Sequence, residues 1–158
     1  MKQIITKFFL LLFLSMTISC GFKVLNESEG KNFSIKEINT FGDKRINFKI
    51  KNNLLVHSTK NNQNILLINL NTKKTKNIKD KNIKNEITKY QLSLNVNIQF
   101  SLINDNKNYE INVSNTGEYL VADGYSTTLN NEKKLIDNLI KDISQKILKK
   151  ISLKLDDI

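Results

Sequence analysis

The chain has 158 residues, enough for one domain with a hydrophobic core, and a formal net charge of +10. A basic surface generally suits an anionic partner, but Arg45 is the only arginine and Pro and Trp are absent, a composition typical of an AT-rich coding sequence, so the charge is weak evidence. The single histidine and the single cysteine exclude a His cluster or a Cys pair as a metal site.

Residues 1–19 are predicted to be a cleaved signal peptide of the lipoprotein type. Lys2 and Lys7 precede an apolar run over residues 8–14, which is too short to cross a bilayer as a helix. The small residue Ser19 then precedes Cys20, the only thiol of the chain. This junction has the pattern of a lipobox, in which a small side chain lets the signal peptidase bind the backbone before the acylated cysteine.

Cys20 is therefore predicted to become the mature N-terminus and to carry a diacylglycerol and a fatty acyl chain such as palmitate. Two or three acyl chains anchor a protein durably, whereas a single chain anchors it only marginally. Bacterial lipoproteins that stay in the inner membrane typically have Asp directly after the acylated cysteine. This chain has Gly21 at that position, which favours the outer membrane. Thr17 departs from the usual Leu, and the alternative is an ordinary signal peptide or short anchor that ends near a buried cysteine.

The mature chain is interpreted as a lipidated tether over residues 20–32 and a single domain over residues 33–158. Residues 33–40 alternate imperfectly between apolar and polar types, which predicts a first strand. The short aliphatic block over residues 65–70 lies between Asn-rich turns and predicts a second strand.

A first helix is predicted over residues 43–57. Gly42 ends the preceding strand, and Asp43 is a favourable N-cap. The apolar residues that repeat every four positions, and so mark the buried face, are Ile46, Ile50 and Leu54.

Residues 90–102 carry the strongest periodic signal, because every even position is apolar and every odd position is polar. This pattern predicts one long strand with a buried face and a solvated face. A turn at residues 104–107 leads to apolar residues at odd positions up to Val121, so the two strands are predicted to form a hairpin, with Gly117 as a bulge or kink. The predicted buried face of the long strand is Tyr90, Leu92, Leu94, Val96, Ile98, Phe100 and Leu102.

A long amphipathic helix is predicted from a cap at Asn130 or Asn131 onward. Its apolar face is predicted to consist of Leu135, Leu139, Ile143, Ile147 and Ile151, and lysines fill the other face. The element order is strand, helix, strand, strand, strand, helix. This order predicts an α+β fold in which two helices pack on a four-stranded, mixed or mostly antiparallel sheet as a two-layer sandwich.

No catalytic constellation is recognisable in the sequence. His57 is predicted to be a partly exposed residue at a helix end, and the carboxylates of Asp105, Glu110, Glu118 and Asp123 are scattered among turns and strand edges. Phosphate-binding loops, nucleophile elbows and paired acids are missing from the sequence. We therefore expect a binding or assembly protein, with no cofactor beyond the acyl groups of Cys20.

The lysine-rich stretch over residues 73–89 is predicted to be a loop between the second and third strands. Two interpretations stay open: a solvated surface that reflects the lysine-rich composition, and a face that binds anions. Export removes the chain from nucleic acid, so lipid phosphates are the anions we expect it to meet.

Four short segments form a recognisable combination: Cys-Gly-Phe at 20–22, Thr-Lys-Tyr-Gln-Leu at 88–92, Tyr-Ser at 125–126 and Asn-Glu-Lys at 131–133. Together they resemble the LptE family of lipopolysaccharide (LPS) assembly lipoproteins. The predicted element order also resembles that family's sandwich of two helices and four strands. The resemblance covers the mature chain and depends on order and patterning more than on a diagnostic motif.

This resemblance implies a non-catalytic subunit of the outer membrane. Members of the family plug a large β-barrel, LptD, stabilise its assembly, and bind LPS on its way to the outer leaflet. In these proteins, basic residues on the loop before the long strand contact LPS phosphates. The resemblance therefore implies such a role for Lys81, Lys84 and Lys89. This chain departs from the family in that lysine supplies a point charge where arginine would supply a bidentate fork. The alternative is a free-standing periplasm-facing lipoprotein that binds a lipid or small ligand without a barrel partner.

Overall fold

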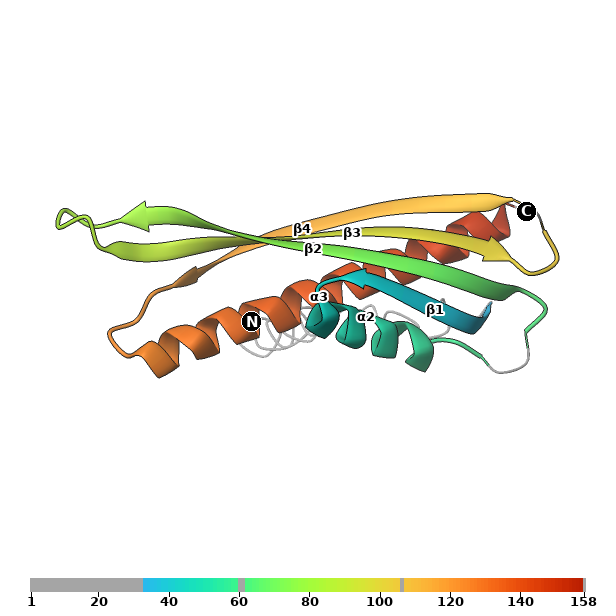
Figure 1. The fold of residues 1–158 in the computed structure, drawn as a ribbon, viewed down its shortest axis with the longest axis horizontal. Coiled ribbons are helices and arrows are strands. Elements are labelled where there is room, and N and C mark those ends of the chain that lie inside the picture. Colours follow the sequence, from blue (N-terminus) through green and yellow to red (C-terminus); the bar gives the residue numbers. More distant parts are fainter. Residues whose placement is uncertain (1–32, 60–61, 106, 158) are drawn as a thin grey trace, which may run out of the picture.

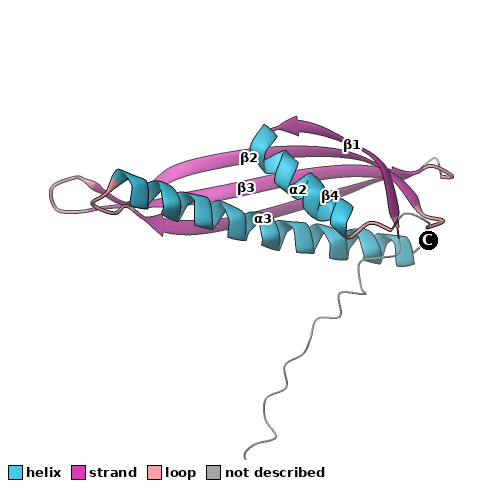
Figure 2. Cartoon of the chain, turned by 90° about the horizontal axis from the view of Figure 1, so that it is seen from below, coloured by secondary structure: helices cyan, strands magenta, loops and turns pink. Residues whose placement is uncertain are grey.

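The computed structural model describes residues 33–59, 62–105 and 107–157, and these form a two-layer α+β sandwich. The elements in chain order are β1 (Ser34–Gly42), α2 (Lys44–Val56), β2 (Ile65–Lys81), β3 (Ile87–Leu102), β4 (Asn108–Leu120) and α3 (Tyr125–Asp156). The sheet order is β1-β2-β3-β4; β1 is parallel to β2, and the other neighbours are antiparallel. Both helices lie on the same side of the sheet (Figures 1 and 2). The predicted fold class and element order are confirmed.

The passage from β1 to α2 follows the sequence prediction. The alternation of β1 is imperfect because its register with β2 shifts between Ile35 and Glu37. Gly42 has a φ of +90°, and a Cβ there would lie 2.0 Å from the Thr72 carbonyl oxygen, so only glycine fits. Asp43 then caps the helix, because its Oδ1 accepts hydrogen bonds from the backbone N–H groups of Arg45 and Ile46.

The lysine-rich stretch is not the predicted loop. β2 continues from Ile65 to Lys81, so the prediction that this strand ends at residue 70 is wrong. Lysine and asparagine have low intrinsic strand propensity, but β3 offers a partner along the whole length, with pairs from Leu66–Leu102 to Lys81–Ile87. The ladder hydrogen bonds and cross-strand contacts outweigh the local preference.

The β3–β4 hairpin confirms the predicted alternation but corrects the role of Gly117. The pairing register runs without a shift from Lys89–Leu120 to Ser101–Asn108, so Gly117 is not a bulge. A Cβ at this position would lie 2.5 Å from Cδ1 of Leu135. The glycine therefore lets α3 approach the sheet closely.

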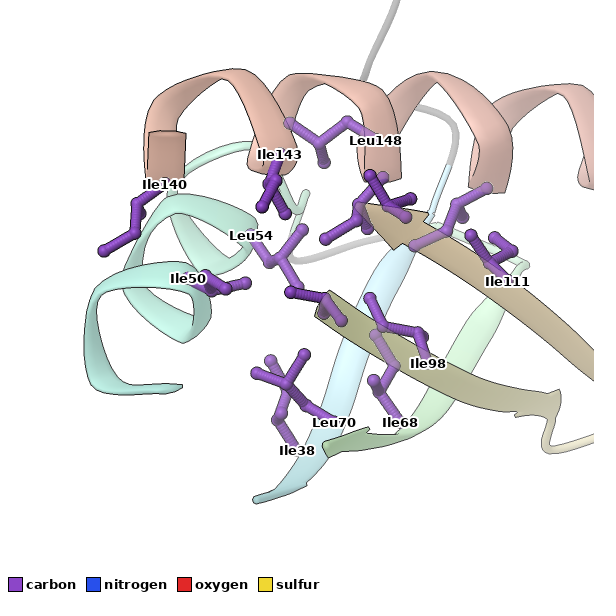
Figure 3. Close-up of a cluster of buried hydrophobic side chains, with 14 of the residues drawn as sticks. Ile38, Ile50, Leu54, Ile68, Leu70, Ile98, Ile111, Ile140, Ile143 and Leu148 are labelled. Atoms are coloured by element: carbon purple, nitrogen blue, oxygen red, sulfur yellow. The ribbon is translucent and has the colours of Figure 1, made fainter. Parts of the chain in front are cut away.

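The hydrophobic core fills the space between the helices and one face of the sheet (Figure 3). Most of the predicted core is confirmed as buried, whereas Tyr90 and Leu135 are partly buried and pack against it. The confirmed residues are Ile46, Ile50, Leu54, Leu92, Leu94, Val96, Ile98, Phe100, Leu102, Leu139, Ile143, Ile147 and Ile151.

The last helix begins earlier than predicted. α3 starts at Tyr125 behind the N-cap Gly124, and not after Asn130 or Asn131. The Thr128 hydroxyl oxygen lies 2.9 Å from the backbone nitrogen of Ala122, whose N–H donates to it, and this bond fixes the added first turn. Asn131 instead donates from Nδ2 to the Leu120 carbonyl oxygen at 3.1 Å.

The predictions for the N-terminal segment lie outside the described residues. They concern the signal peptide over residues 1–19, the lipidated Cys20 and the tether up to residue 32. Among the described elements, neither α2 nor α3 contains an apolar stretch of membrane-spanning length.

Candidate functional site

The candidate site is the hairpin tip, residues 82–86, which joins β2 to β3. Figure 1 shows this tip projecting beyond the helical layer at one end of the molecule. The length of the two strands causes the projection, because β2 has 17 residues and β3 has 16. Residues of the tip therefore lie apart from the core and are open to an external partner.

Hydrogen bonds within the tip fix its conformation. The Asn82 Oδ1 atom accepts from the backbone N–H groups of Lys84 and Glu86, each at 3.0 Å. Asn82 also exchanges backbone bonds with Glu86 and Asn85, and Asn85 adopts a φ of +63°. Asparagine tolerates this left-handed conformation better than most residues. These hydrogen bonds make the tip an ordered turn and fix the directions in which its side chains leave the backbone.

Three side chains of the tip region combine positive charge with an apolar group. Lys81 Nζ donates to the Asn85 Oδ1 at 2.9 Å, and Lys84 is exposed. Neither lysine forms an ion pair with any residue that the structure describes. Ile83 lies between them and is fully exposed. Cationic groups beside an isolated apolar side chain suit an amphiphilic anion.

Lys89, the third predicted contact, lies in a different setting. It is within β3, and its Nζ is 3.1 Å from Asp80 Oδ2 and 3.5 Å from Glu118 Oε2. The hydrogen bond to the Asp80 carboxylate, with the charges of both acids, raises the pKa of Lys89. Lys79 is also 3.5 Å from Glu118. The sequence prediction therefore groups residues that the structure separates: Lys81 and Lys84 are near the tip, and Lys89 is paired within the sheet.

A cluster that we call the Lys76 clamp lies where the hairpin leaves the helical layer, and sequence reasoning missed it. It consists of Lys76 on β2, Tyr90 on β3, Tyr119 on β4 and Glu132 on α3. Lys76 Nζ and the Tyr119 hydroxyl each donate to Glu132 Oε2 at 2.7 Å. Lys76 Nζ also lies 4.2 Å from the centre of the Tyr90 ring, which stacks on Tyr119.

The pKa shifts in the clamp follow from burial and these bonds. Burial alone would lower the pKa of Lys76, but the hydrogen bonds and charges of Glu132 and Tyr119 together outweigh it, and the pKa is raised. Burial raises the pKa of Tyr119. Burial would also raise the pKa of Glu132, but the hydrogen bonds from Lys76 and Tyr119 lower it overall. Each group therefore keeps its ordinary charge at neutral pH. We interpret the clamp as a structural link between the sheet and α3.

The uncovered face of the sheet is rich in amide side chains. Asn71, Asn97 and Asn112 form one row across β2, β3 and β4, and Asn97 Nδ2 donates to Asn112 Oδ1 at 2.8 Å. A shallow hollow of about 340 Å³ lies over this row, bounded by Lys73 and Ser114. The polar residues at odd positions of the long strand predicted a solvated face. They did not predict that Asn97 would align with Asn71 and Asn112 of the neighbouring strands.

A second hollow, of about 670 Å³, lies between α2 and α3. His57 lines it, and its Nδ1 is 2.8 Å from the Asn53 carbonyl oxygen. Asn53 in turn donates to the Ser144 hydroxyl at 3.2 Å. The histidine thus closes the helix end, in agreement with the prediction of a partly exposed terminal residue. Within the described part of the chain, no group of three His, Cys, Asp or Glu residues is placed to hold a metal ion.

The fold defines a two-layer α+β domain of the type found in solved bacterial lipoproteins. The crystal structure of rare lipoprotein B from Shewanella oneidensis matches with a TM-score of 0.60 and 10% identity, over 77% of this chain and 97% of that one. The solution structure of lipoprotein B from Nitrosomonas europaea matches with a TM-score of 0.55 and 15% identity, over 86% of this chain and 93% of that one. At these identities the likeness shows the fold alone. No family model and no curated protein matches the chain.

Proposed function

We propose that this chain is an outer-membrane lipoprotein, anchored through Cys20, that acts as a non-catalytic plug and assembly partner of an LptD-like β-barrel. It binds LPS during transport to the outer leaflet. The observation that carries the proposal is the fold likeness to rare lipoprotein B, which spans 97% of that chain. The likeness supports a lipoprotein of this fold, in agreement with the Ser19-Cys20 junction, and the assignment to the LptE family comes from the sequence resemblance.

The hairpin tip supports LPS as the ligand. Lipid A combines phosphate groups with acyl chains, and the tip and the adjoining end of β2 combine Lys81 and Lys84 with the fully exposed Ile83. Lysines that lack carboxylate partners among the described residues keep their charge available for phosphate. We therefore assign phosphate contacts first to Lys81 and Lys84, and give Lys89 a structural role because it is paired with Asp80 and Glu118.

The amide-rich face supports a barrel as the protein partner. A barrel lumen is lined by polar side chains, because strand residues alternate between lipid and lumen. The row of Asn71, Asn97 and Asn112 offers hydrogen-bond donors and acceptors without net charge to such a wall. The row itself can be covered without leaving charges buried and unpaired, whereas Lys73 and Glu110 on the same face would need partners on the barrel wall.

The test is affinity purification of the lipidated, tagged chain from outer membranes after mild detergent extraction. We expect a barrel-sized outer-membrane protein to co-purify in a fixed ratio, and mass spectrometry to find Cys20 acylated. Cys20→Ala should give an unprocessed or soluble form. Recovery of the acylated chain without any barrel would support the free-standing lipoprotein instead, whereas an unmodified thiol at Cys20 would rule out the anchor.

A further inference from the structure

The helix α2 is apolar on two opposite sides. Its buried side contacts the core through Ile46, Ile50 and Leu54, which are at most 3% exposed. The opposite side, which we call the outward face of α2, carries Phe48, Leu55 and Val56. Their exposed fractions are 64%, 41% and 78%. A surface helix of a globular domain usually has one apolar stripe, so these exposed residues mark a candidate contact surface.

Helical geometry places the outward side chains together. Residues 48 and 55 are seven apart, which is close to two full turns, so they project in nearly the same direction. Phe48 and Leu55 therefore share one direction, with Lys51 and Asn52 between them at i+3 and i+4 of Phe48. Val56 is the last residue of α2 and follows Leu55 directly, so it adds a third exposed apolar side chain at the end of the helix, rotated by about 100° from Leu55.

The charges of α2 point to an anionic partner. The helix contains Lys44, Arg45, Lys49 and Lys51, and it has no acidic residue. Lys49 pairs with Asp137 of α3, whereas the other three form no ion pair with a described residue. Exposed apolar side chains flanked by cations are typical of helices that lie in the plane of a membrane interface.

The position of α2 in the chain places it near a membrane anchor. Three residues after the helix, Thr59 binds the Phe33 carbonyl oxygen through its backbone N–H at 3.0 Å and its hydroxyl at 3.2 Å. The described domain therefore begins beside the C-terminal end of α2. Residues 20–32, even fully extended, span at most about 45 Å. An acyl group on Cys20 would keep the outward face at a high effective concentration near the bilayer.

We propose that the outward face of α2 lies on an anionic lipid bilayer, with Phe48, Leu55 and Val56 at the level of the headgroups and with Lys44 and Arg45 on lipid phosphates. The proposal depends on the acyl anchor of the proposed function but not on the barrel. Figure 1 shows the hairpin tip at the end of the molecule opposite the start of β1, beyond the helical layer that contains α2. This second contact orients the anchored domain.

The test uses tryptophan fluorescence, because the chain has no Trp of its own. The acylated Phe48→Trp protein is reconstituted into vesicles of phosphatidylglycerol and phosphatidylethanolamine, with bromine-labelled lipid as quencher. Val56→Trp is a second probe on the same face. Leu67→Trp is the matched control, because Leu67 is also an exposed apolar residue but borders a hollow on the uncovered sheet face with Asn69 and Gln99.

We expect blue-shifted emission and lipid quenching for both α2 probes, at least about twofold stronger than for the control. Adding Lys44→Glu and Arg45→Glu, or using phosphatidylcholine vesicles, should reduce the quenching, because anionic lipid attracts basic residues near the surface. Equal quenching of the α2 probes and the control, or no lipid quenching of the α2 probes, would overturn the proposal. If the α2 probes contact lipid while no barrel co-purifies from outer membranes, the proposed function fails and this inference stands.

Discussion

At the scale of single residues, two glycines have different reasons to be glycine. Gly42 combines a φ of +90° with a backbone oxygen of Thr72 in the position a Cβ would occupy. Gly117 lies in a part of β4 that pairs with β3 without a register shift. A Cβ there would clash only with the end of the Leu135 side chain. A backbone carbonyl held by strand pairing cannot move aside, whereas a leucine methyl can be turned away by a change of rotamer.

Gly42→Ala should therefore destabilise the protein more than Gly117→Ala. We expect about 2 kcal/mol or more for Gly42→Ala, from strain at positive φ and the clash, and about 1 kcal/mol for Gly117→Ala. Urea unfolding of the two variants measures the difference in midpoint. Gly124→Ala is the control, because the nearest atom to its Cβ would be Thr127 Oγ1 at an ordinary 3.5 Å. Equal losses for the first two would contradict the distinction.

At the scale of elements, the sequence predicts those whose own pattern is strong. The alternation of residues 90–102 and the Asp43 cap of α2 are local signals, and both predictions are confirmed. The tail of β2 depends on pairing with β3, which the lysines of the tail do not reveal. The first turn of α3 contains Ser and Thr, which are weak helix formers, and depends on Thr128 bonding to Ala122.

The candidate site was also predictable only where its residues are close in sequence. Lys81 and Lys84 are close in sequence and remain close at the tip, whereas the pairing of Lys89 with Glu118 joins residues far apart in the chain. The Lys76 clamp joins four elements, and nothing in the local sequence around Lys76 or Glu132 predicts their contact. Fold class follows from patterns within segments, but ion pairs between segments require the register of the sheet.

The clamp gives stability a dependence on pH. The pKa of Glu132 is lowered from its ordinary 4.5, so its ionised form stabilises the folded state above that pH, and this contribution is lost as the pH falls through the lowered value. The pKa values of Lys76 and Tyr119 are raised, so their contributions persist at neutral pH and are lost only as the pH rises through the raised values, above the ordinary 10.5 and 10.0.

We therefore expect Glu132→Gln to lower the urea midpoint at pH 7 and to have a smaller effect at pH 3. The amide keeps the shape of the side chain but removes the charge that Lys76 and Tyr119 contact. Glu37→Gln, at an exposed carboxylate of β1, is the control for general loss of acidic charge. An effect of Glu132→Gln that is the same at both pH values would show that the ionised carboxylate contributes nothing specific.

At the scale of the whole molecule, the fold separates two surfaces. The 17 residues of β2 span about 55 Å along the sheet. Figure 1 shows the hairpin tip at one end of this axis, while β1 begins toward the other end. An anchored domain can therefore hold one end near the bilayer of its own acyl chains and present Lys81, Ile83 and Lys84 at a distance from it.

The last prediction concerns LPS binding at that distant end, and follows from the proposed function. Changing Lys81 and Lys84 together to Glu should lower LPS affinity by on the order of tenfold to a hundredfold, because each cation near an anionic lipid surface contributes about 1 kcal/mol. Neither side chain belongs to the core, so folding and barrel association should persist. Added salt should weaken wild-type binding, since exposed charges are screened over about 8 Å at physiological ionic strength.

The control must remove the same charge from a site with no assigned role. Lys146 and Lys149 of α3 are exposed and form no ion pair with a described residue, whereas Lys150 donates to the Asn112 carbonyl oxygen at the edge of β4. Lys146→Glu with Lys149→Glu is therefore the matched variant. Calorimetric titration of both double variants with LPS, at low and high salt, separates local from general charge effects. If the two variants bind LPS equally, the lysines near the tip are a solvated surface of a lysine-rich chain.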